Sequence, residues 1–210
     1  MCFGGDEDLS EIDYKKEIPL LENQINIEVS NFLNKINKKI NKEEVYFKHL
    51  KNRLSFVQWM NKKFDLSFSD IPARVMQREI FYCQLGNNLG SEQGTKRPVV
   101  VLQNNIGNKF GNTTIIAPIT TYENSKFTKT NGVWYIEYEK DGALVKRKLD
   151  FYEVPVELEE NPVQTVVGIT NIVHMREVSK KRLSKTPVAK VTIDNFNEIK
   201  NAVIKNLDLL

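Results

Sequence analysis

The stretch Gly90–Asn104, which reads GSEQGTKRPVVVLQN, places a polar loop directly before an apolar run. Gly90 and Gly94 bound the polar part of the loop, and its basic end, Lys96-Arg97, leads through Pro98 into three valines. An unbroken β-branched run of this length is typical of a buried strand. The segment therefore predicts a loop between two strands, with an arginine at the start of the second strand.

This loop is not typical of a nucleotide phosphate loop. The GxxxxGK[ST] spacing is absent, because Lys96 is followed by Arg97-Pro98, and a strand rather than a helix comes next. A proline favours extended backbone at the residue before it, so Arg97 is expected at the root of the strand. There its planar guanidinium has the geometry to bind a phosphate, or it pairs with a surface carboxylate. The residues alone leave both readings open.

The character of the chain changes near residue 70. Before it, apolar residues recur at steps of three and four, which predicts two amphipathic helices joined near Asn41 as a hairpin. The first run consists of Leu21, Ile25, Val29, Phe32, Leu33, Ile36 and Ile40, and the second of Val45, Leu50, Leu54, Val57, Met60 and Phe64. Pro19 suits a first helical turn. A helix pair alone rarely buries enough surface to be stable, so we expect this one to pack on something else.

After residue 70 the pattern predicts short strands and one closing helix, which together suggest a small barrel. The predicted strands cover residues 79–85, 98–103, 113–120, 133–138, 144–149, 164–169 and 174–178. Asp141-Gly142 is a strong hairpin-turn signal, and Asp194 has the character of a helix N-cap. The predicted organisation is an acidic tail over residues 1–17, a helical hairpin over 18–70 and a mainly β domain over 71–210.

Composition and charge narrow the class of protein only slightly. The net charge is +3, and residues 1–76 contain 12 Lys and Arg against 12 Asp and Glu, while 77–210 contain 18 against 15. A small basic excess suits an RNA-binding groove, as it suits many unrelated proteins. Cys2 and Cys83 form no disulfide framework or metal spacing. With no secretory signal and no membrane span, we expect a cytoplasmic protein.

Several blocks of the sequence, taken in order, resemble the MazF/PemK family of toxin ribonucleases. The blocks are Gly90–Gly94, Arg97–Asn104, Gly107-Asn108 and Ile119-Thr120. The resemblance is close from Gln77 to Thr121 and weaker over residues 164–210, where Met175-Arg176 and Arg182-Leu183 match.

The resemblance implies an SH3-like small barrel, of the MazF/PemK/CcdB type, with a C-terminal helix and a homodimeric assembly. It implies metal-independent cleavage of single-stranded mRNA at short sequences, with no cofactor. It further implies growth inhibition within a type II toxin-antitoxin system and neutralisation by an antitoxin peptide lying across the RNA groove. The family's essential arginine falls on Arg97 and its essential threonine on Thr120. The residues expected to bind RNA are Gly90, Ser91, Glu92, Gln93, Gly94 and Lys96, with Asn104 at the edge of the site.

The chemistry agrees with these residue types, because RNA supplies its own nucleophile, the 2′-hydroxyl. Arg97 and Thr120 suit stabilisation of the charged phosphorane. Arginine is a poor general base, whereas Glu92 is a possible one by residue type. The two histidines, His49 and His174, both lie outside the loop. Aromatic residues that are candidates for stacking on bases, or alternatively for the barrel core, are Tyr122, Phe110, Trp134 and Tyr135.

Two departures from the family pattern bear on function. Arg78 stands where the family has a glycine, and residues 121–163 are longer than usual, with an extra hairpin over Trp134–Leu149. The alternative function is a non-catalytic binding protein on the same fold, acting on a protein or DNA partner, since fold alone does not decide. A third hypothesis is autoinhibition, in which the acidic residues within 6–17 cover the basic groove.

Overall fold

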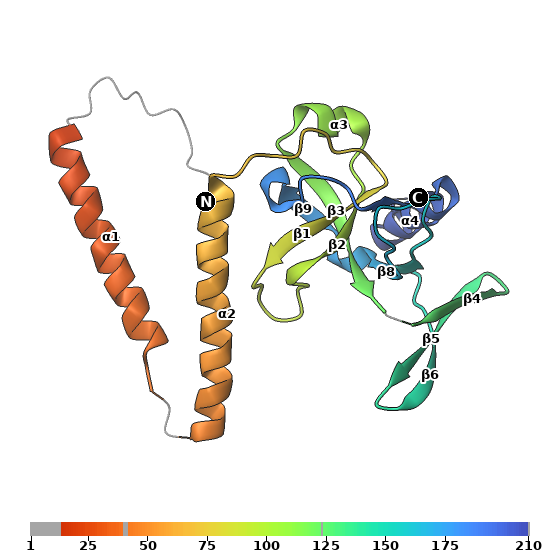
Figure 1. Cartoon of the computed structure of the whole chain (residues 1–210), viewed down its shortest axis with the longest axis horizontal. Coiled ribbons are helices and arrows are strands. Elements are labelled where there is room, and N and C mark those ends of the chain that lie inside the picture. The colour runs from red at the N-terminus through yellow and green to blue at the C-terminus, as the bar shows by residue number, and fades with distance from the viewer. Residues whose placement is uncertain (1–13, 40–41, 123, 210) are drawn as a thin grey trace. The chain divides into compact units, whose positions relative to one another are not determined.

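The computed structural model describes residues 14–39, 42–122 and 124–209 of the chain. By its internal contacts the chain divides into two compact units, residues 1–57 and 58–210. Helix α1 (Tyr14–Ile36) and the first part of α2 (Glu43–Ser67) belong to the first unit, and all strands belong to the second (Figure 1). Both predicted helices are therefore present. Within the described ranges, no helix is long and apolar enough to cross a membrane.

Helix α1 begins earlier than the sequence predicted. Residues 14–17, assigned to the acidic tail, are already helical, so Pro19 lies in the second turn rather than the first. A proline there lacks the N–H that would bond to the carbonyl of residue 15, which weakens this end of the helix. The rest of the predicted tail and Ile40 lie outside the described residues.

The first unit leaves its apolar side chains uncovered. Across the turn between the helices, Arg53 Nη1 donates to the carbonyls of Ile36 at 2.7 Å and Lys38 at 2.8 Å. The Phe32 and Phe56 rings lie 5.9 Å apart. The apolar residues of the predicted helix face are nonetheless 46–61% exposed at Leu21, Ile25, Val29 and Leu33. Within the described residues the helix pair alone therefore does not bury its apolar face.

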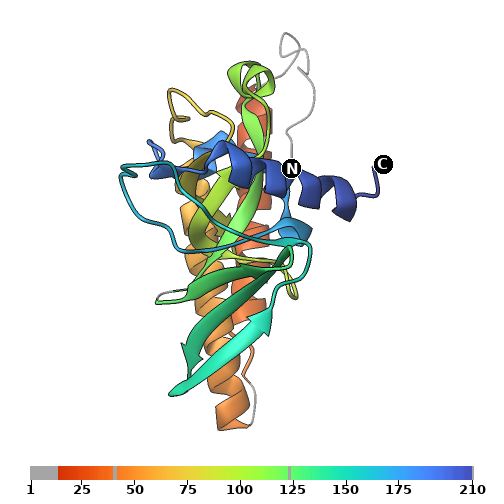
Figure 2. The same ribbon diagram turned by 90° about the vertical axis from the view of Figure 1, so that its right-hand side faces the viewer.

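The second unit is built on a strongly curved sheet with strand order β10-β1-β2-β3-β8-β7, and β9 also pairs with β3 (Figure 2). The strands are β1 (Glu79–Gly86), β2 (Thr95–Val101), β3 (Thr113–Thr121), β7 (Glu153–Pro155), β8 (Gly168–Asn171), β9 (Arg176–Ser179) and β10 (Ala189–Lys190). The two edges meet, because Leu158 forms a bridge with Val191 and Glu159 N donates to the Lys190 carbonyl at 2.8 Å. The predicted small, mainly β barrel is confirmed.

Two apolar cores lie on opposite faces of the sheet. The valine run of β2 alternates between them, with Val100 in the core beneath helix α4 (Ile193–Asn206) and Val99 and Val101 in the other. All three valines are fully buried, as expected for a strand covered on both faces. The side chain of Arg97, at the start of the same strand, has the direction of Val99 and so lies on the face away from α4.

Three local predictions were wrong in detail. The strand predicted over 164–169 is β8, shifted towards 168–171, and His174 lies in a 3₁₀ turn, η2 (Ile172–His174), before β9. Helix α4 is capped by Thr192, whose hydroxyl accepts from Asn195 N at 3.1 Å, so Asp194 lies inside the first turn. The short helix α3 (Asn105–Phe110) was not predicted, and Asn104 caps it by accepting from Gly107 N at 2.8 Å. A second 3₁₀ turn, η3 (Lys180–Arg182), follows β9.

The extra segment after β3 forms a separate three-stranded sheet, here called the inserted sheet: β4 (Lys126–Thr130), β5 (Val133–Lys140) and β6 (Ala143–Lys148). The predicted hairpin at Asp141-Gly142 is confirmed, and both turn residues have positive φ, 53° and 79°. Such values match the two-residue turn that this dipeptide favours. The first strand, β4, was not predicted.

Arg78 has a φ of 75°, which explains why its position suits a glycine. Its side chain compensates, because Arg78 Nη1 donates to Glu159 Oε1 at 2.8 Å and to the Val191 carbonyl at 3.1 Å. We therefore expect Arg78→Gly to be more stable than Arg78→Ala by about 1 kcal/mol, since alanine loses the same bonds yet keeps the strain. Urea unfolding measures the difference, and alanine being the more stable variant would contradict it.

Candidate functional site

Arg97 is held by the loop that precedes it. Its Nε donates to the Gly94 carbonyl at 3.0 Å, and its Nη1 donates to Gln93 Oε1 at 2.8 Å. The residue is half-buried, and burial lowers the pKa of its guanidinium below the usual value. An arginine nevertheless stays charged at neutral pH, so the site contains a fixed cation with an oriented fork of donors.

Gln93 links Arg97 to Thr120, although the two residues come from different strands. Thr120 lies near the end of β3, and its Oγ1 accepts from Gln93 Nε2 at 3.2 Å. A guanidinium only donates, so the amide oxygen of Gln93 must face Arg97 and its NH₂ group must face Thr120. The amide orientation is therefore determined by its two partners, and the three side chains form one hydrogen-bonded row.

The two ends of the loop between β1 and β2 lie close together where the loop supports this row. A Cβ added at Gly94 would lie 2.6 Å from the Gly86 carbonyl oxygen, a backbone atom that cannot turn away. Asn88 Nδ2 donates to the Gln93 carbonyl at 2.7 Å across the same loop. Gly90 has a φ of 58°, and a Cβ added there would meet nothing within 4 Å, so it serves the turn rather than close packing. Position 94 must therefore be glycine, because the backbone of Gly86 leaves no room for a Cβ atom.

The other predicted site residues spread outward from this row. Ser91 and Glu92 are exposed, and Glu92 Oε2 lies 3.9 Å from Arg176 Nη1. The Lys96 ammonium lies 5.1 Å from the centre of the Tyr82 ring, on the far side of β2 from Arg97. Asn104 caps α3 beyond the opposite end of β2, so the structure does not bring it to Arg97.

Two further arginines support the end of β1 where the loop begins. Arg176 Nη2 and Arg182 Nη1 both donate to the Leu85 carbonyl, at 2.9 and 3.1 Å. Both lie near Cys83, and burial is the main reason that the pKa of its thiol rises to about 12. The weaker family match at Arg176 and Arg182 was the only sequence signal for this support.

A cavity of about 440 Å³ opens beside the last residues of β3. Tyr82, Thr121, Tyr122 and Gln164 line it, and Gln164 Nε2 donates to the Tyr82 hydroxyl at 2.9 Å. Thr121 directly follows Thr120, but neighbouring side chains of a strand point to opposite faces. The cavity therefore lies on the face of the sheet opposite to the Arg97–Gln93–Thr120 row, next to the end of β3. Two tyrosine rings and an amide offer both stacking surfaces and hydrogen-bonding groups.

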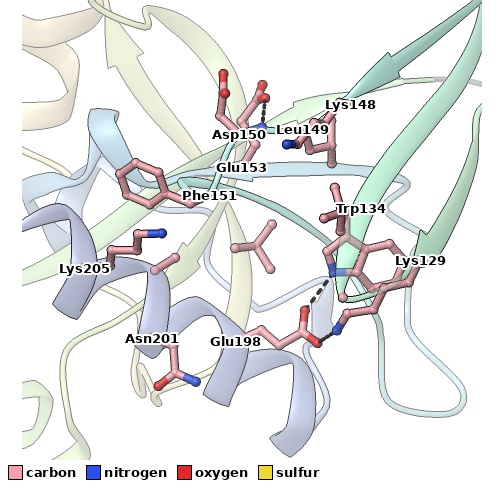
Figure 3. Close-up of a pocket in the computed structure, with 14 residues that line it drawn as sticks. Lys129, Trp134, Lys148, Leu149, Asp150, Phe151, Glu153, Glu198, Asn201 and Lys205 are labelled. Atoms are coloured by element: carbon pink, nitrogen blue, oxygen red, sulfur yellow. Dashed lines mark hydrogen bonds and ion pairs between the residues drawn. The ribbon is translucent and has the colours of Figure 1, made fainter.

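A larger cavity, of about 750 Å³, lies between the inserted sheet and α4 (Figure 3). Glu198 on α4 receives a hydrogen bond from Trp134 Nε1 at 2.9 Å and an ion pair from Lys129. Burial opposes ionisation of Glu198, but these two bonds outweigh it and lower the pKa of the carboxyl. The bonds join the inserted sheet to the barrel's helix, so we interpret this cavity as part of that junction.

His49 lies on α2 and His174 in the η2 turn, and the described contacts place neither in the Arg97 row. Among the described residues, no group of three or more His, Cys, Asp or Glu side chains is arranged to hold a metal ion. The Arg97–Gln93–Thr120 row itself offers three hydrogen-bonding groups: a guanidinium, an amide and a hydroxyl.

The fold and site together define a small closed barrel that presents an anchored arginine beside a threonine at the end of a central strand. The sequence model of the family described as "PemK-like, MazF-like toxin of type II toxin-antitoxin system" matches residues 76–207. The chain belongs to this family, and the predicted resemblance is confirmed.

Individual relatives match over shorter or more divergent stretches. Endoribonuclease EndoA of Bacillus subtilis (strain 168) is 48% identical over 46 residues, which are 22% of this chain and 40% of that protein. The match thus spans less than half of the relative's length. MazF from Deinococcus radiodurans is 17% identical, covering 67% of this chain and 99% of that one, with a TM-score of 0.44. An endoribonuclease in complex with its cognate antitoxin from a Mycobacterial species is 17% identical, covering 65% and 97%, with a TM-score of 0.43.

Proposed function

We propose that this chain is a toxin-type endoribonuclease that cleaves single-stranded RNA through attack of the 2′-hydroxyl on the adjacent phosphate. The observation that carries the proposal is the row formed by Arg97, Gln93 and Thr120. Family membership and the 48% identity with EndoA over 46 residues support the same conclusion. We assign the activity to the barrel, which lies within residues 71–210.

Arg97 suits stabilisation of the dianionic phosphorane. Its hydrogen bonds within the described residues use Nε and one N–H of Nη1, so Nη2 and the second N–H of Nη1 have capacity to donate to a phosphate. Donors fixed before the reaction stabilise developing charge without reorganisation, and this is usually the largest single contribution to catalysis. In our proposal the loop therefore orients the free edge of the guanidinium towards the phosphate.

Thr120 contributes a hydroxyl whose orientation follows from its neighbour. Because its oxygen already accepts from Gln93 Nε2, the hydroxyl proton is free to donate elsewhere. We propose that it donates to a non-bridging phosphate oxygen. Gln93 then acts as a positioning residue that fixes both Arg97 and Thr120, and Thr120→Val would remove the donor while preserving the shape of the strand.

The cavity lined by Tyr82 and Tyr122 is the proposed place for a base of the RNA that passes beyond the end of β3. Thr121 and Tyr122, which line it, directly follow the proposed catalytic threonine, although the cavity opens on the other face of the sheet. Single-stranded RNA exposes base faces that stack on aromatic rings, and the Gln164 amide adds hydrogen-bonding capacity for a base edge. The exposed loop residues Ser91 and Glu92, together with Gly90, would line the path of the RNA.

The mechanism makes a specific prediction about the substrate. A long single-stranded RNA incubated with the protein in EDTA should give discrete fragments ending in a 2′,3′-cyclic phosphate. A short RNA containing the cleaved sequence should become uncleavable when the single nucleotide 5′ of the cut carries 2′-deoxyribose, because the nucleophile is missing. Cleavage of the deoxy-substituted RNA at the same bond would contradict 2′-hydroxyl attack. Tight RNA binding without any cleavage would favour a binding protein instead.

The family's description as a toxin of type II toxin-antitoxin systems supports an antitoxin as the protein partner. We propose that the antitoxin lies across the Arg97 site and that the active species is a homodimer. Co-expression with the cognate antitoxin should restore the growth of cells that the toxin arrests. The acidic residues suggested for autoinhibition lie almost entirely outside the described residues, so deletion of residues 1–70 is the experiment for that hypothesis.

A further inference from the structure

The inserted sheet is attached to the barrel by one of its two faces. Arg147 Nη1 and Nη2 donate to Glu153 at 2.6 and 3.0 Å, and this paired geometry joins β6 to β7. Trp134 and Lys129 bond to Glu198 on α4, as Figure 3 shows. Ile136, on the same face, is fully buried in a small apolar core. These contacts hold the sheet in a defined position, so its opposite face is a preorganised surface.

The strand pairing shows which residues form that opposite face. Lys126 and Lys146 lie on either side of Glu137, and Thr128 and Lys148 lie on either side of Tyr135. Residues directly opposite each other in an antiparallel pair share one face. We call this surface, formed by Lys126, Thr128, Tyr135, Glu137, Lys146 and Lys148, the outer face of the inserted sheet. Glu139 and Leu144 extend the same face towards the Asp141-Gly142 turn, and Lys148, at the end of β6 nearest the barrel, also lines the cavity of Figure 3.

The outer face combines basic side chains with an aromatic ring. Lys126, Lys146 and Lys148 are exposed, and the Lys146 ammonium lies 5.8 Å from the centre of the Tyr135 ring. Glu137, whose side chain is 26% exposed, forms an ion pair with Lys146 and lies between Lys126 and Lys146 on this face. Residues 126–148 contain six Lys and Arg against three Asp and Glu, so this short segment carries a net charge of +3.

The inserted sheet adjoins the proposed catalytic residues along the chain and in space. Its first strand begins at Lys126, shortly after the segment Thr120-Thr121-Tyr122, and the centre of the Tyr122 ring lies 5.3 Å from that of Tyr138 on β5. Tyr122 also lines the cavity beside Thr121. Both views show the sheet extending outward from the end of the barrel at which β3 finishes (Figures 1 and 2). A strand of RNA that leaves the site past Tyr122 therefore meets the inserted sheet next.

We propose that the outer face of the inserted sheet binds the single-stranded RNA that flanks the cleaved bond, an inference that rests on the proposed ribonuclease function. Lys126, Lys146 and Lys148 contact phosphates, and Tyr135 stacks on a base. A sheet surface that pairs cations with an aromatic ring suits single-stranded RNA, which repeats phosphates and base faces along its length. An acidic peptide would use the lysines but has no aromatic bases for Tyr135.

The test uses the full chain with Arg97→Ala, so that RNA is bound without being cut. In this background, Lys126→Gln, Lys146→Gln and Lys148→Gln are combined. The control combines Lys109→Gln, Lys185→Gln and Lys200→Gln, three exposed lysines elsewhere on the barrel and its helices. Both sets remove three positive charges. The affinity for a long single-stranded RNA is measured at several salt concentrations, and thermal unfolding verifies that each variant is folded.

The outer-face variant should bind the long RNA at least about tenfold more weakly than the control. A plot of the logarithm of its binding constant against the logarithm of salt concentration should be shallower by about 2. Tyr135→Ala alone should weaken binding about tenfold with little change in slope. With Arg97 restored, the outer-face variant should cut a short RNA that spans only the cleaved sequence at the normal rate.

Equal affinity and equal slope for the two lysine sets would overturn the inference while leaving the ribonuclease function intact. Normal RNA affinity with lost binding of the antitoxin would instead assign the outer face to an acidic protein partner. If the unaltered chain neither binds nor cuts RNA, the proposed function and this inference are both wrong.

Discussion

Replacing Arg97 with alanine should lower the rate of RNA cleavage by at least about 100-fold, the loss typical when one preorganised donor to a developing charge is removed. The guanidinium is the fixed cation of the site, and it is oriented by Gly94 and Gln93. Single-turnover cleavage of a labelled RNA measures the effect without interference from product release.

Arg97→Lys is the informative companion variant. Lysine keeps the positive charge but cannot donate to the Gly94 carbonyl and the Gln93 amide at once with a planar fork. If orientation matters as proposed, lysine should restore little of the lost rate. Full activity in Arg97→Lys would mean that charge alone suffices, and full activity in Arg97→Ala would remove Arg97 from the mechanism.

Replacing Gly94 with alanine should be the second most damaging change. The new Cβ would lie 2.6 Å from the Gly86 carbonyl oxygen, so the two ends of the loop must separate. Arg97 would then lose the carbonyl that accepts from its Nε, and Gln93 would move away from Thr120. We expect about 100-fold slower cleavage and a loss of about 1–3 kcal/mol in the free energy of unfolding.

The matched control for Gly94 is Gly132→Asn in the turn between β4 and β5. Gly132 has a φ of 77° and open space around it, and asparagine tolerates that backbone conformation. Urea unfolding and single-turnover cleavage should therefore show little change in this variant. Wild-type cleavage by Gly94→Ala would show that the loop tolerates the separation and that Arg97 does not depend on it.

Short sequence patterns were sufficient to predict the strands and turns in which they occur. The valine run of β2 and the Asp141-Gly142 turn were correctly predicted because β-branched runs and that dipeptide each favour one backbone geometry. The same patterns did not predict where the elements begin and end, as the shift of β8 to Gly168–Asn171 and the capping of α4 by Thr192 show. A β-branched run carries little information on register, and two capping residues two positions apart compete until the packing of the helix selects one.

The row formed by Arg97, Gln93 and Thr120 was only partly predictable. Family resemblance indicated Arg97 and Thr120, but Gln93 was expected only to line the RNA site. Its bond to Thr120 joins residues separated by 27 positions in the chain, and no local pattern contains such a contact. The same applies to Arg78, whose side chain donates to Glu159 and to the Val191 carbonyl and so offsets part of the cost of its positive φ.

The sequence by itself determined the family, the mainly β barrel with its closing helix, and the loop that carries the arginine, because these depend on side-chain periodicity and on short ordered motifs. Only the tertiary structure decided how Gln93 connects the two strands, why Gly94 must lack a side chain, and which face of the inserted sheet is left open. Each of these depends on distances between residues far apart in the chain, and such distances exist only once the barrel has closed.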